Sequence, residues 1–467
     1  MNIILIMADT FRYDNLFDRA ALPVRTPHLD AFSQQAVSLE QFYTGSFPTI
    51  PQRTDMISGR YGWPWYPWQP LDRSTGNSLP GILAQNGYVS QLICDTPHLF
   101  NARFQHVFTA AEALRGQEGD VHHLHMNHPI PNAMPPEKTR PGKHFQERNL
   151  VDIHRWQNRD WAGEGDRFPP RTAKAAVEWL EQNYRHDPFL LWVDFFDPHE
   201  PWDPPEYMVR KYDPDYTGAP MLHPNYGRAD DYTPEELQNL RAHYCAEAEL
   251  VDRWVGRILE KIDDLELWDN SIVVFVSDHG MSLGEHNRTG KSNISDRDNR
   301  FWPIYPDVAH ILFLAAAPGL EGGRTVKGFA QPVDVLPSLL DLARVDPSAP
   351  EPFHGRSFAA ALRGDAAHIG VDCAVSASFL RPAEDGGIRA KSVTPVLYTE
   401  DWTYAPIGPE GERQLFDSKS DPYAENDLAA ANPDAVKALQ ERLIGWLRDL
   451  GAPAEVIDLV TVKGLLP

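Results

Sequence analysis

Short apolar runs that end in polar residues recur along the chain, and each predicts a buried strand. Ile3–Met7 leads into Asp9, and Ser271–Val276 leads into Asp278. Pro188–Asp194 is a third continuous apolar run that ends on an acid. Strands covered on both faces lack the alternation of half-exposed strands, which is typical of parallel sheets. The other predicted strands of this kind are Tyr88–Cys94 and Ile311–Ala315.

Helical segments alternate with these strands. The sequence Thr233-Pro-Glu-Glu has a hydroxyl N-cap, proline at the first helical position and acids in the first turn. It predicts a helix that runs to about Asp264. Further helices are predicted at Leu79–Asn86, Arg171–Tyr184 and Val333–Ala343. The alternation predicts an α/β protein with a mainly parallel sheet flanked by helices, whose strands deliver polar residues to one edge.

The pattern changes near residue 370, where short strand-like segments replace the alternation. This change predicts a small antiparallel sheet followed by a helix. We therefore divide the chain into a main domain, residues 1–369, and a smaller C-terminal α+β subdomain, residues 370–467. Residues 115–170 are predicted to form an insertion over the site. The C-terminal strands are predicted at Cys373–Phe379, Ser392–Thr399, Trp402–Pro406 and Arg413–Phe416, and the helix at Pro433–Leu450.

Composition excludes several classes of protein. With 43 basic and 66 acidic residues the net charge is −23, and a negative field repels polyanions, so general binding of nucleic acid is not expected. No apolar stretch approaches the roughly 18 residues of a membrane span, and the N-terminus lacks the basic region of a signal peptide. Three widely spaced cysteines fit a reducing compartment. We therefore expect a cytoplasmic protein with neither a membrane nor a nucleic acid as partner.

Polar residues that suit a metal ion and an anion gather in a few segments. Several of these segments follow predicted strands, so they are expected to meet at one edge of the sheet. Hard oxygen donors with one imidazole suit a divalent cation, and hydroxyl, guanidinium and ammonium groups beside it suit a tetrahedral oxyanion. The segments are Asp9, Thr49-Ile-Pro-Gln-Arg53 with Ser58-Gly-Arg60, Asp197-Pro-His199, Asp278-His-Gly280, and Gly284-Glu-His286 with Gly290-Lys291.

In order and spacing these segments resemble the sulfatase family of the alkaline phosphatase superfamily. The family's signature is Cys or Ser, then x-Pro-Ser-Arg, four residues and Thr-Gly-Arg; this chain has Thr49-x-Pro-Gln-Arg53, four residues and Ser58-Gly-Arg60. The resemblance implies an alkaline-phosphatase-like fold and a metal-dependent hydrolase of small anionic esters of sulfate, phosphate or phosphonate. Further matching segments are Asp197–Trp202, Arg241–Asp252, Ser277–His286, Val308–Ile311, Pro318-Gly319, Val333–Leu340, Leu415–Asp417 and Asp421-Pro422.

The resemblance implies one divalent metal ion at the strand ends. Asp9, Asp278 and His279 would be its ligands, together with the hydroxyl of Thr49, which stands at the position of the nucleophile. Oxygen ligation with a single histidine permits Ca²⁺, Mg²⁺ or Mn²⁺, and the imidazole moves the preference towards Mn²⁺ or Zn²⁺.

The resemblance also implies an anion site beside the metal. Arg53 would hold the Thr49 loop and offset charge, and His98 stands where the family has the histidine of Lys-x-His. His199 and Lys291 would contact the transferred group or its leaving oxygen. His286 is either a second substrate contact or a residue that packs beside Lys291.

Three threonines depart from the family's pattern. Thr10 replaces a second acid after the first strand, and Thr96 replaces the lysine of Lys-x-His. At position 49 sulfatases convert Cys or Ser into formylglycine, whose hydrate expels sulfate by collapsing to the aldehyde. Thr49 would give a ketone, so no formylglycine is expected. Because the phosphodiesterase branch of the superfamily uses an unmodified threonine beside a metal, hydrolysis of a phosphodiester or phosphonate ester is favoured.

Several alternatives remain open at this point. One is a true sulfuric ester hydrolase, for example on a sulfated sugar, and another is a catalytically silent homologue that only binds anions. Both a monomer and a homo-oligomer are compatible with the sequence. Trp63, Trp65 and Trp68 either form a stacking wall for a sugar or aromatic leaving group or belong to the core. A solvated insertion is favoured over a metal-binding tract for His122, His123, His125 and His128.

Overall fold

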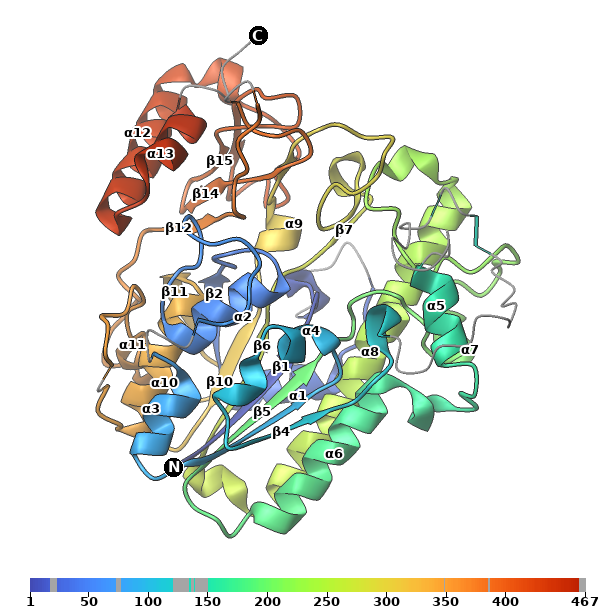
Figure 1. The fold of residues 1–467 in the computed structure, drawn as a ribbon, viewed down its shortest axis with the longest axis vertical. Helices are drawn as coiled ribbons and strands as arrows, with labels where there is room; N and C mark the ends of the chain where they lie inside the picture. Colours follow the sequence, from blue (N-terminus) through green and yellow to red (C-terminus); the bar gives the residue numbers. More distant parts are fainter. Residues whose placement is uncertain are drawn as a thin grey trace.

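The fold has a central sheet covered by helices and a smaller sheet with two helices beyond it (Figure 1). A computed structural model describes residues 1–16, 23–72, 77–120, 134, 135, 138, 150–347, 349–384 and 387–461. The architecture confirms the predicted α/β class with a mainly parallel sheet and a small antiparallel sheet near the C-terminus.

Strand β1 (Asn2–Ala8) lies in the middle of the eight-stranded central sheet. It pairs in parallel with β6 (Ser271–Ser277) on one side and with β5 (Phe189–Phe195) on the other, and Ala8 lies opposite both Ser277 and Phe195. All three strands therefore end at the same edge of the sheet. In spatial order the strands are β11 (Thr325–Ala330), β2 (Val37–Phe42), β10 (Phe313–Ala316), β6, β1, β5, β3 (Val89–Cys94) and β4 (Ala110–Ala113).

Strand β10 runs against its neighbours. It pairs antiparallel with β6, where Phe313 lies opposite Val276, and antiparallel with β2. Its apolar run carries no signal for direction, because a strand covered on both faces is continuously apolar whichever way it runs.

Alternate residues of β1 point to opposite faces of the sheet, as the pleat requires. Ile3, Leu5 and Met7 join one hydrophobic core, and Ile4 and Ile6 join the other. Because both faces are covered, the whole strand is buried and its sequence is apolar throughout. The first face is covered by α2 (Thr49–Ser58), α3 (Leu79–Gln85) and α10 (Val335–Ala343), and the second by α1 (Pro27–Gln35), α6 (Phe168–Asn183) and α8 (Pro234–Asp264) (Figure 1).

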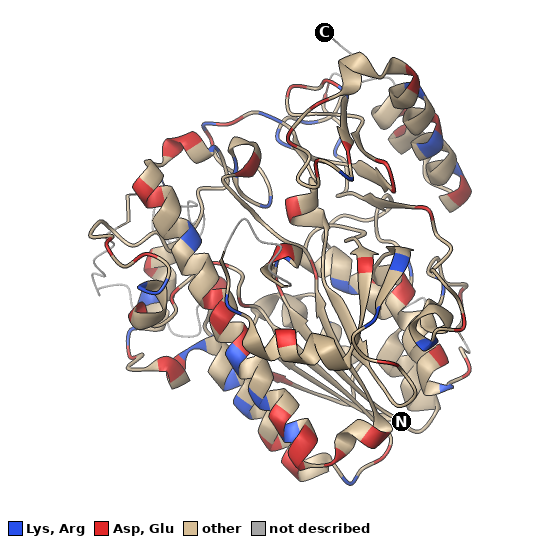
Figure 2. Ribbon diagram, turned by 180° about the vertical axis from the view of Figure 1, so that it is seen from behind, with Lys and Arg blue, Asp and Glu red and all other residues tan. Residues whose placement is uncertain are grey.

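Helix α8 begins at the predicted capping sequence. The Thr233 hydroxyl accepts a hydrogen bond from the Glu236 N–H at 3.3 Å, and the Glu236 carboxylate accepts one from the Thr233 N–H at 2.8 Å. These bonds satisfy two of the amide groups that every helix start leaves without an intrahelical partner. Acidic and basic residues recur along α8 (Figure 2), while apolar residues such as Val251, Val255 and Ile258 pack in the core on the sheet.

The C-terminal unit has its own sheet and a separate hydrophobic cluster, which Trp63 of the main domain also joins. Four antiparallel strands are followed by α12 (Pro433–Leu450) and α13 (Ala454–Thr461). Leu397 and Leu415 of the sheet share a buried cluster with Leu443 of α12. The predicted segment Ser392–Thr399 is divided into two short strands. The strands of this part are β12 (Cys373–Ser376), β13 (Val393–Thr394), β14 (Val396–Thr399), β15 (Trp402–Ala405) and β16 (Gln414–Asp417).

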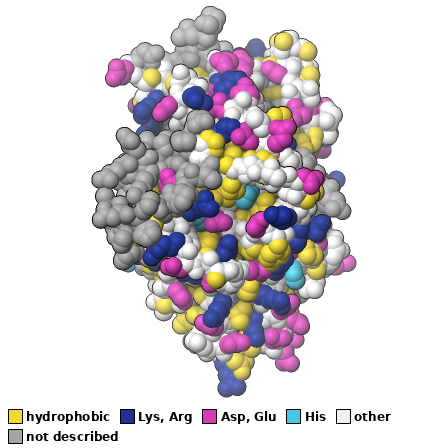
Figure 3. Space-filling model, turned by 90° about the vertical axis from the view of Figure 1, so that its right-hand side faces the viewer, with side chains coloured by type: hydrophobic (Ala, Val, Ile, Leu, Met, Phe, Trp, Pro, Cys, Tyr) yellow, Lys and Arg dark blue, Asp and Glu magenta, His cyan; other side chains and the backbone are white. Residues whose placement is uncertain are grey.

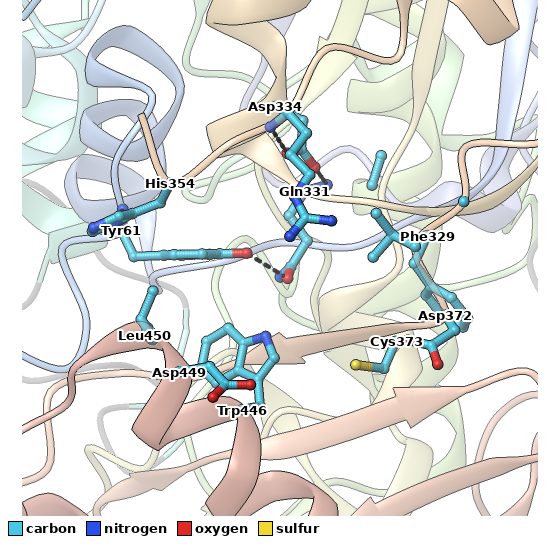
Figure 4. Close-up of a pocket in the computed structure, with 14 residues that line it drawn as sticks. Tyr61, Phe329, Gln331, Asp334, His354, Asp372, Cys373, Trp446, Asp449 and Leu450 are labelled. Atoms are coloured by element: carbon cyan, nitrogen blue, oxygen red, sulfur yellow. Dashed lines mark hydrogen bonds between the residues drawn. The ribbon is translucent and has the colours of Figure 1, made fainter. Parts of the chain in front are cut away.

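A cavity of about 440 Å³ lies where the C-terminal unit meets the main domain. Tyr61, shortly after α2, donates its hydroxyl hydrogen bond to Gln331 Oε1 at 2.8 Å and meets the edge of Trp446 at 5.5 Å (Figure 4). The segment after α2 is thus held between the two units.

The remaining α-helices and strands are α4 (Pro97–Asn101), α5 (Leu150–Gln157), α7 (Glu206–Val209), α9 (Pro306–Ala309), α11 (Ala359–Arg363), β7 (Ser282–Leu283), β8 (Thr289–Gly290) and β9 (Trp302–Pro303).

The surface mixes charges of both signs. On the side seen in Figure 3, acidic and basic side chains lie among one another around a group of hydrophobic side chains. Across the described residues, no helix has the length and apolar character needed to cross a membrane. Cys94, Cys245 and Cys373 are free cysteines.

Candidate active site

The carboxyl ends of β1 and β6 bring three metal-binding side chains together. Asp9 directly follows β1, and Asp278 and His279 directly follow β6. Each offers one ligand atom, and these atoms all lie within 4.8 Å of one another. All three residues are fully buried.

Thr49 presents its hydroxyl to this cluster. It is the first residue of α2, and its Oγ1 lies 3.4 Å from His279 Nε2. Thr49 is buried, and its position at the start of a helix places it at the positive end of the helix dipole. An anion bound at Thr49 would therefore be favoured by the backbone as well as by side chains.

The hydrogen bonds of His279 define its protonation. Nδ1 lies 3.0 Å from the carbonyl oxygen of Gly280, which only accepts, so Nδ1 carries the proton. The lone pair of Nε2 then faces Asp278 Oδ2 at 3.4 Å and Asp9 Oδ1 at 3.8 Å. Burial, followed by the charge of Lys291, lowers the pKa of His279 well below its usual value, so the ring is neutral.

This donor set fits a divalent cation. Two carboxylates, one hydroxyl and one imidazole nitrogen with its lone pair converge here, all from buried residues. Asp9 Oδ2 is buried without a hydrogen bond, although it lies 3.1 Å from a guanidinium nitrogen of Arg53. Oxygen ligands and a His nitrogen held in this tautomer by a backbone carbonyl are typical of protein metal sites.

Arg53 links the cluster to a third strand. One side of its guanidinium binds Asp194, at the end of β5, at 2.7 and 2.9 Å. The other side donates to Asp278 Oδ2 at 2.7 Å and to the carbonyl oxygen of Thr49 at 3.2 Å. Asp194 was not among the predicted site residues, although the acid at the end of its apolar run was the signal that could have identified it.

Thr10 occupies the position at which the family's pattern has a second acid. Its N–H donates to Asp278 Oδ1 at 2.9 Å, and its hydroxyl donates to Asp9 Oδ1 at 2.7 Å. Lys291 Nζ lies 3.5 Å from Thr10 Oγ1 and 3.8 Å from Asp9 Oδ1. Thr10 thus fixes both carboxylates without adding a charge of its own, and Lys291 stands beside them as a cation.

His199 is buried within reach of the charges of Lys291 and Asp9, and His98 is partly exposed. His199 is 3% exposed, donates from Nδ1 to the carbonyl oxygen of Glu200 at 2.7 Å and stacks on Phe196 at 3.9 Å. Burial lowers its pKa. The His98 ring lies 5.6 Å from that of Phe196, and its Nε2 is hydrogen-bonded to Glu118 Oε2.

Glu118 was not predicted as a site residue. It lies in the 115–170 segment, whose irregular sequence gives no periodicity from which a position could be read. Its contact with His98 brings the described start of that segment to the site. The cluster of His122, His123, His125 and His128 lies outside the described residues.

His286 has different neighbours from the other predicted site residues. Its Nε2 donates to the carbonyl oxygen of Tyr423 at 2.9 Å, and its ring stacks on Tyr305 at 3.8 Å. These contacts connect the segment after β6 to the C-terminal unit. They place His286 as a packing residue rather than in the group formed by Asp9, Thr49 and Lys291.

Comparison with known proteins agrees with this fold. The family model described as Sulfatase matches residues 1–345. Arylsulfatase K of Mus musculus is 24% identical over 483 residues, which cover 95% of this chain and 78% of that protein. An ulvan-active sulfatase of Formosa agariphila is 25% identical over 440 residues, covering 91% and 76% of the two chains.

Among solved structures, the phosphonate monoester hydrolase of Agrobacterium radiobacter has a similar fold. It superposes with a TM-score of 0.72 at 21% identity, covering 96% of both chains. The family match, which spans well over half of the 467 residues, supports a hydrolase of sulfate or phosphate esters. The chain belongs to the sulfatase family.

Proposed function

We propose that the protein hydrolyses phosphodiesters or phosphonate monoesters, with Thr49 as the nucleophile. The observation that carries this proposal is the place of the Thr49 hydroxyl, which is buried at the start of α2 and 3.4 Å from His279 Nε2. The sulfatase signature has Cys or Ser at this position. A threonine hydroxyl keeps the nucleophilic oxygen and excludes conversion to formylglycine.

The ion that completes the site would be held by Asp9, Thr49, Asp278 and His279. A divalent cation, when bound, lowers the pKa of a coordinated hydroxyl and stabilises negative charge on a phosphoryl oxygen. The chain itself provides the remaining charges. Lys291, 3.8 Å from Asp9 Oδ1, would bind an oxygen of the transferred group.

In the proposed reaction Thr49 Oγ1 forms a bond to phosphorus while the bond from phosphorus to the ester oxygen breaks. The Thr49 hydroxyl proton passes to solvent, and the departing alkoxide takes up a proton, so an alcohol is released. Water then attacks phosphorus in the Thr49 adduct. This second step restores the hydroxyl and releases the phosphonate or phosphate monoester.

The same route is less favourable for a sulfate ester. The formylglycine hydrate of a sulfatase expels sulfate as the aldehyde forms. Thr49 has no second hydroxyl on the same carbon and cannot release sulfate in this way. A sulfated Thr49 would be released only by attack of water on sulfur. This step is slow, so the sulfated enzyme should accumulate. The phosphonate monoester hydrolase that shares the fold also supports the phosphorus ester, although the likeness itself concerns the fold.

A sulfate ester remains the second candidate substrate. Support for it comes from the match to the sulfatase model over residues 1–345 and from the ulvan-active sulfatase among the relatives. A sulfated sugar would then be the substrate class. The two candidates differ in the central atom of the ester, so one pair of test substrates with the same leaving group separates them.

The test uses p-nitrophenyl esters of phenylphosphonate and of sulfate with protein loaded with Mn²⁺. We expect a higher kcat/KM for the phosphonate and, by intact mass, a sulfated adduct during incubation with the sulfate. Thr49→Ala should abolish phosphonate turnover, and Thr49→Ser should keep part of it, because only the hydroxyl is required. Faster sulfate turnover with unmodified Thr49, or full activity of Thr49→Ala, would show the proposal to be wrong. A protein that binds phosphonate and hydrolyses neither ester would be a silent anion-binding homologue.

A further inference from the structure

The three tryptophans in the segment after α2 have different surroundings. Trp63 is 1% exposed and stacks on Trp446 at 6.0 Å, so it belongs to the contact with the C-terminal unit. Trp65 stacks on His354 at 5.5 Å. Trp68 is 45% exposed. Of the two expectations for these residues, core packing therefore describes Trp63, whereas Trp68 keeps nearly half of its surface in solvent.

The segment that carries Trp68 is fixed at both ends. At its start, the Tyr61 hydroxyl donates to Gln331 Oε1 at 2.8 Å (Figure 4). At its end, the Leu71 N–H donates to the carbonyl oxygen of Ala102 at 2.8 Å, directly after α4. Trp68 is thus presented from a tethered segment next to the helix that carries His98. A ring in a fixed place binds a partner with less loss of conformational entropy than a free one.

A line of rings connects Trp68 to the active site. Its indole meets the His98 imidazole at 5.3 Å in a perpendicular arrangement, and His98 lies 5.6 Å from Phe196. Phe196 in turn stacks on His199 at 3.9 Å. Exposure falls along this line: Trp68 is 45% exposed, the His98 side chain is 29% exposed, and His199 is buried. The line therefore runs from solvent to His199, on which the charges of Lys291 and Asp9 act.

The polar groups beside Trp68 favour an uncharged leaving group. His98 is hydrogen-bonded to the Glu118 carboxylate, so the imidazole next to the indole already has an anionic partner. A second anionic group on the substrate would approach this carboxylate and be repelled. An indole beside a hydrogen-bonding imidazole suits either an aromatic ring or the C–H face of a pyranose, with hydroxyl groups at its rim.

We propose that Trp68 forms a leaving-group subsite for an ester whose alcohol or phenol carries a neutral ring. The transferred group would lie at Thr49 and the ring on the indole, with His98 between them. The inference rests on the proposed function in that it takes the Thr49 cluster as the reaction centre. Phenyl and pyranosyl esters both offer an apolar ring face to the indole, and binding measurements separate them.

The experiment measures binding and turnover in three variants. Calorimetric titration of Mn²⁺-loaded protein with phenyl phosphate, glucose 1-phosphate and ethyl phosphate gives the preference for each ring over the ethyl group. Trp68→Ala should reduce that preference by about 2- to 12-fold for at least one ring, the range expected for a single aromatic contact. Trp68→Phe should keep most of it. Tyr66→Ala is the matched control, because Tyr66 is 48% exposed in the same segment and lines a different cavity.

Turnover of phenyl and ethyl methylphosphonate by the same proteins gives a second readout. The ratio of wild type to Trp68→Ala should be larger for the phenyl ester, and dividing by each substrate's wild-type rate removes its intrinsic reactivity. Equal loss for both esters, or an unchanged preference in the titrations, would overturn the subsite. If wild type hydrolyses neither ester, the proposed function fails, and the titrations alone decide whether Trp68 binds the ring.

Discussion

Replacing Arg53 by methionine tests how the buried charges of the site hold one another. Arg53 and its three carboxylate partners are fully buried. The guanidinium lies 2.7 Å from Asp194, 2.7 Å from Asp278 and 3.1 Å from Asp9. Methionine is unbranched and uncharged, so Arg53→Met leaves the carboxylates without their common cation.

Because these charges are fully buried, the loss in the free energy of unfolding should be large. Removing one partner of a buried ion pair costs about 3–5 kcal/mol because the other charge stays buried and unpaired. Asp194→Asn should cost less, about 1–3 kcal/mol, because Arg53 keeps its contacts with Asp278 and Asp9. The double variant Arg53→Met/Asp194→Asn removes both members of the pair. Its cost should fall short of the sum by about 0.5–3 kcal/mol.

The assay is unfolding in urea, followed by circular dichroism, for the wild type, both single variants and the double variant in the presence of chelator. Arg53→Met combined with Asp421→Asn is the control cycle. Asp421 is also buried, but it accepts hydrogen bonds from the N–H groups of Glu425 and Asn426 in the C-terminal unit. That pair should be additive within about 0.5 kcal/mol. Additivity of Arg53→Met and Asp194→Asn would refute the reasoning, because it would mean that the two charges do not support each other.

Three further predictions concern the metal, the anion site and pH. Mn²⁺ at 100 times its Kd should stabilise the wild type by about 2.7 kcal/mol, and Asp278→Asn should need a higher Mn²⁺ concentration for the same rise in Tm. Lys291→Met should lower kcat about 10²- to 10³-fold with a smaller change in KM if the lysine binds charge that develops in the transition state; an effect on KM alone would contradict this. Burial lowers the pKa of His243 from 6.5 to about 4, so its contribution to stability is complete above pH 6.5 and is lost as the pH falls towards 4, by about 3 kcal/mol in all. Between pH 7 and pH 4.5 the free energy of unfolding should fall less for His243→Gln than for the wild type. An equal fall in both proteins would contradict the prediction.

The sequence was sufficient to predict most of the central sheet. Continuous apolar runs identified β1, β5 and β6, and the polar residues behind β1 and β6 are the ones that meet at the sheet edge. The direction of β10 was not predictable, because the apolar run is the same for either direction and only the path of the chain between β6 and β10 decides it.

The partners within the site were harder to predict than its position. Arg53 was expected to offset charge, but its bidentate contact with Asp194 depends on the neighbouring places of β5 and β1 in the sheet. Glu118 reaches His98 from a segment without periodicity. His286 lies in a matching motif, yet its ring stacks on Tyr305. Local sequence identifies residue types that suit a site, whereas the packing of distant segments selects which of them face it.

The position of β1 between β5 and β6 has a consequence for how the chain folds. Thr10 and Asp278, joined by a hydrogen bond at the sheet edge, are 268 residues apart in the sequence. During synthesis β1 is made before β5 and β6, its two neighbours in the sheet. One of its edges therefore stays unpaired until β6 has been made. A ribosome-bound or truncated chain that ends before residue 271 would expose this apolar strand edge and would lack Asp278 and His279. Nascent chains of this protein should therefore bind chaperones until β6 appears, and metal uptake should be among the last events of folding.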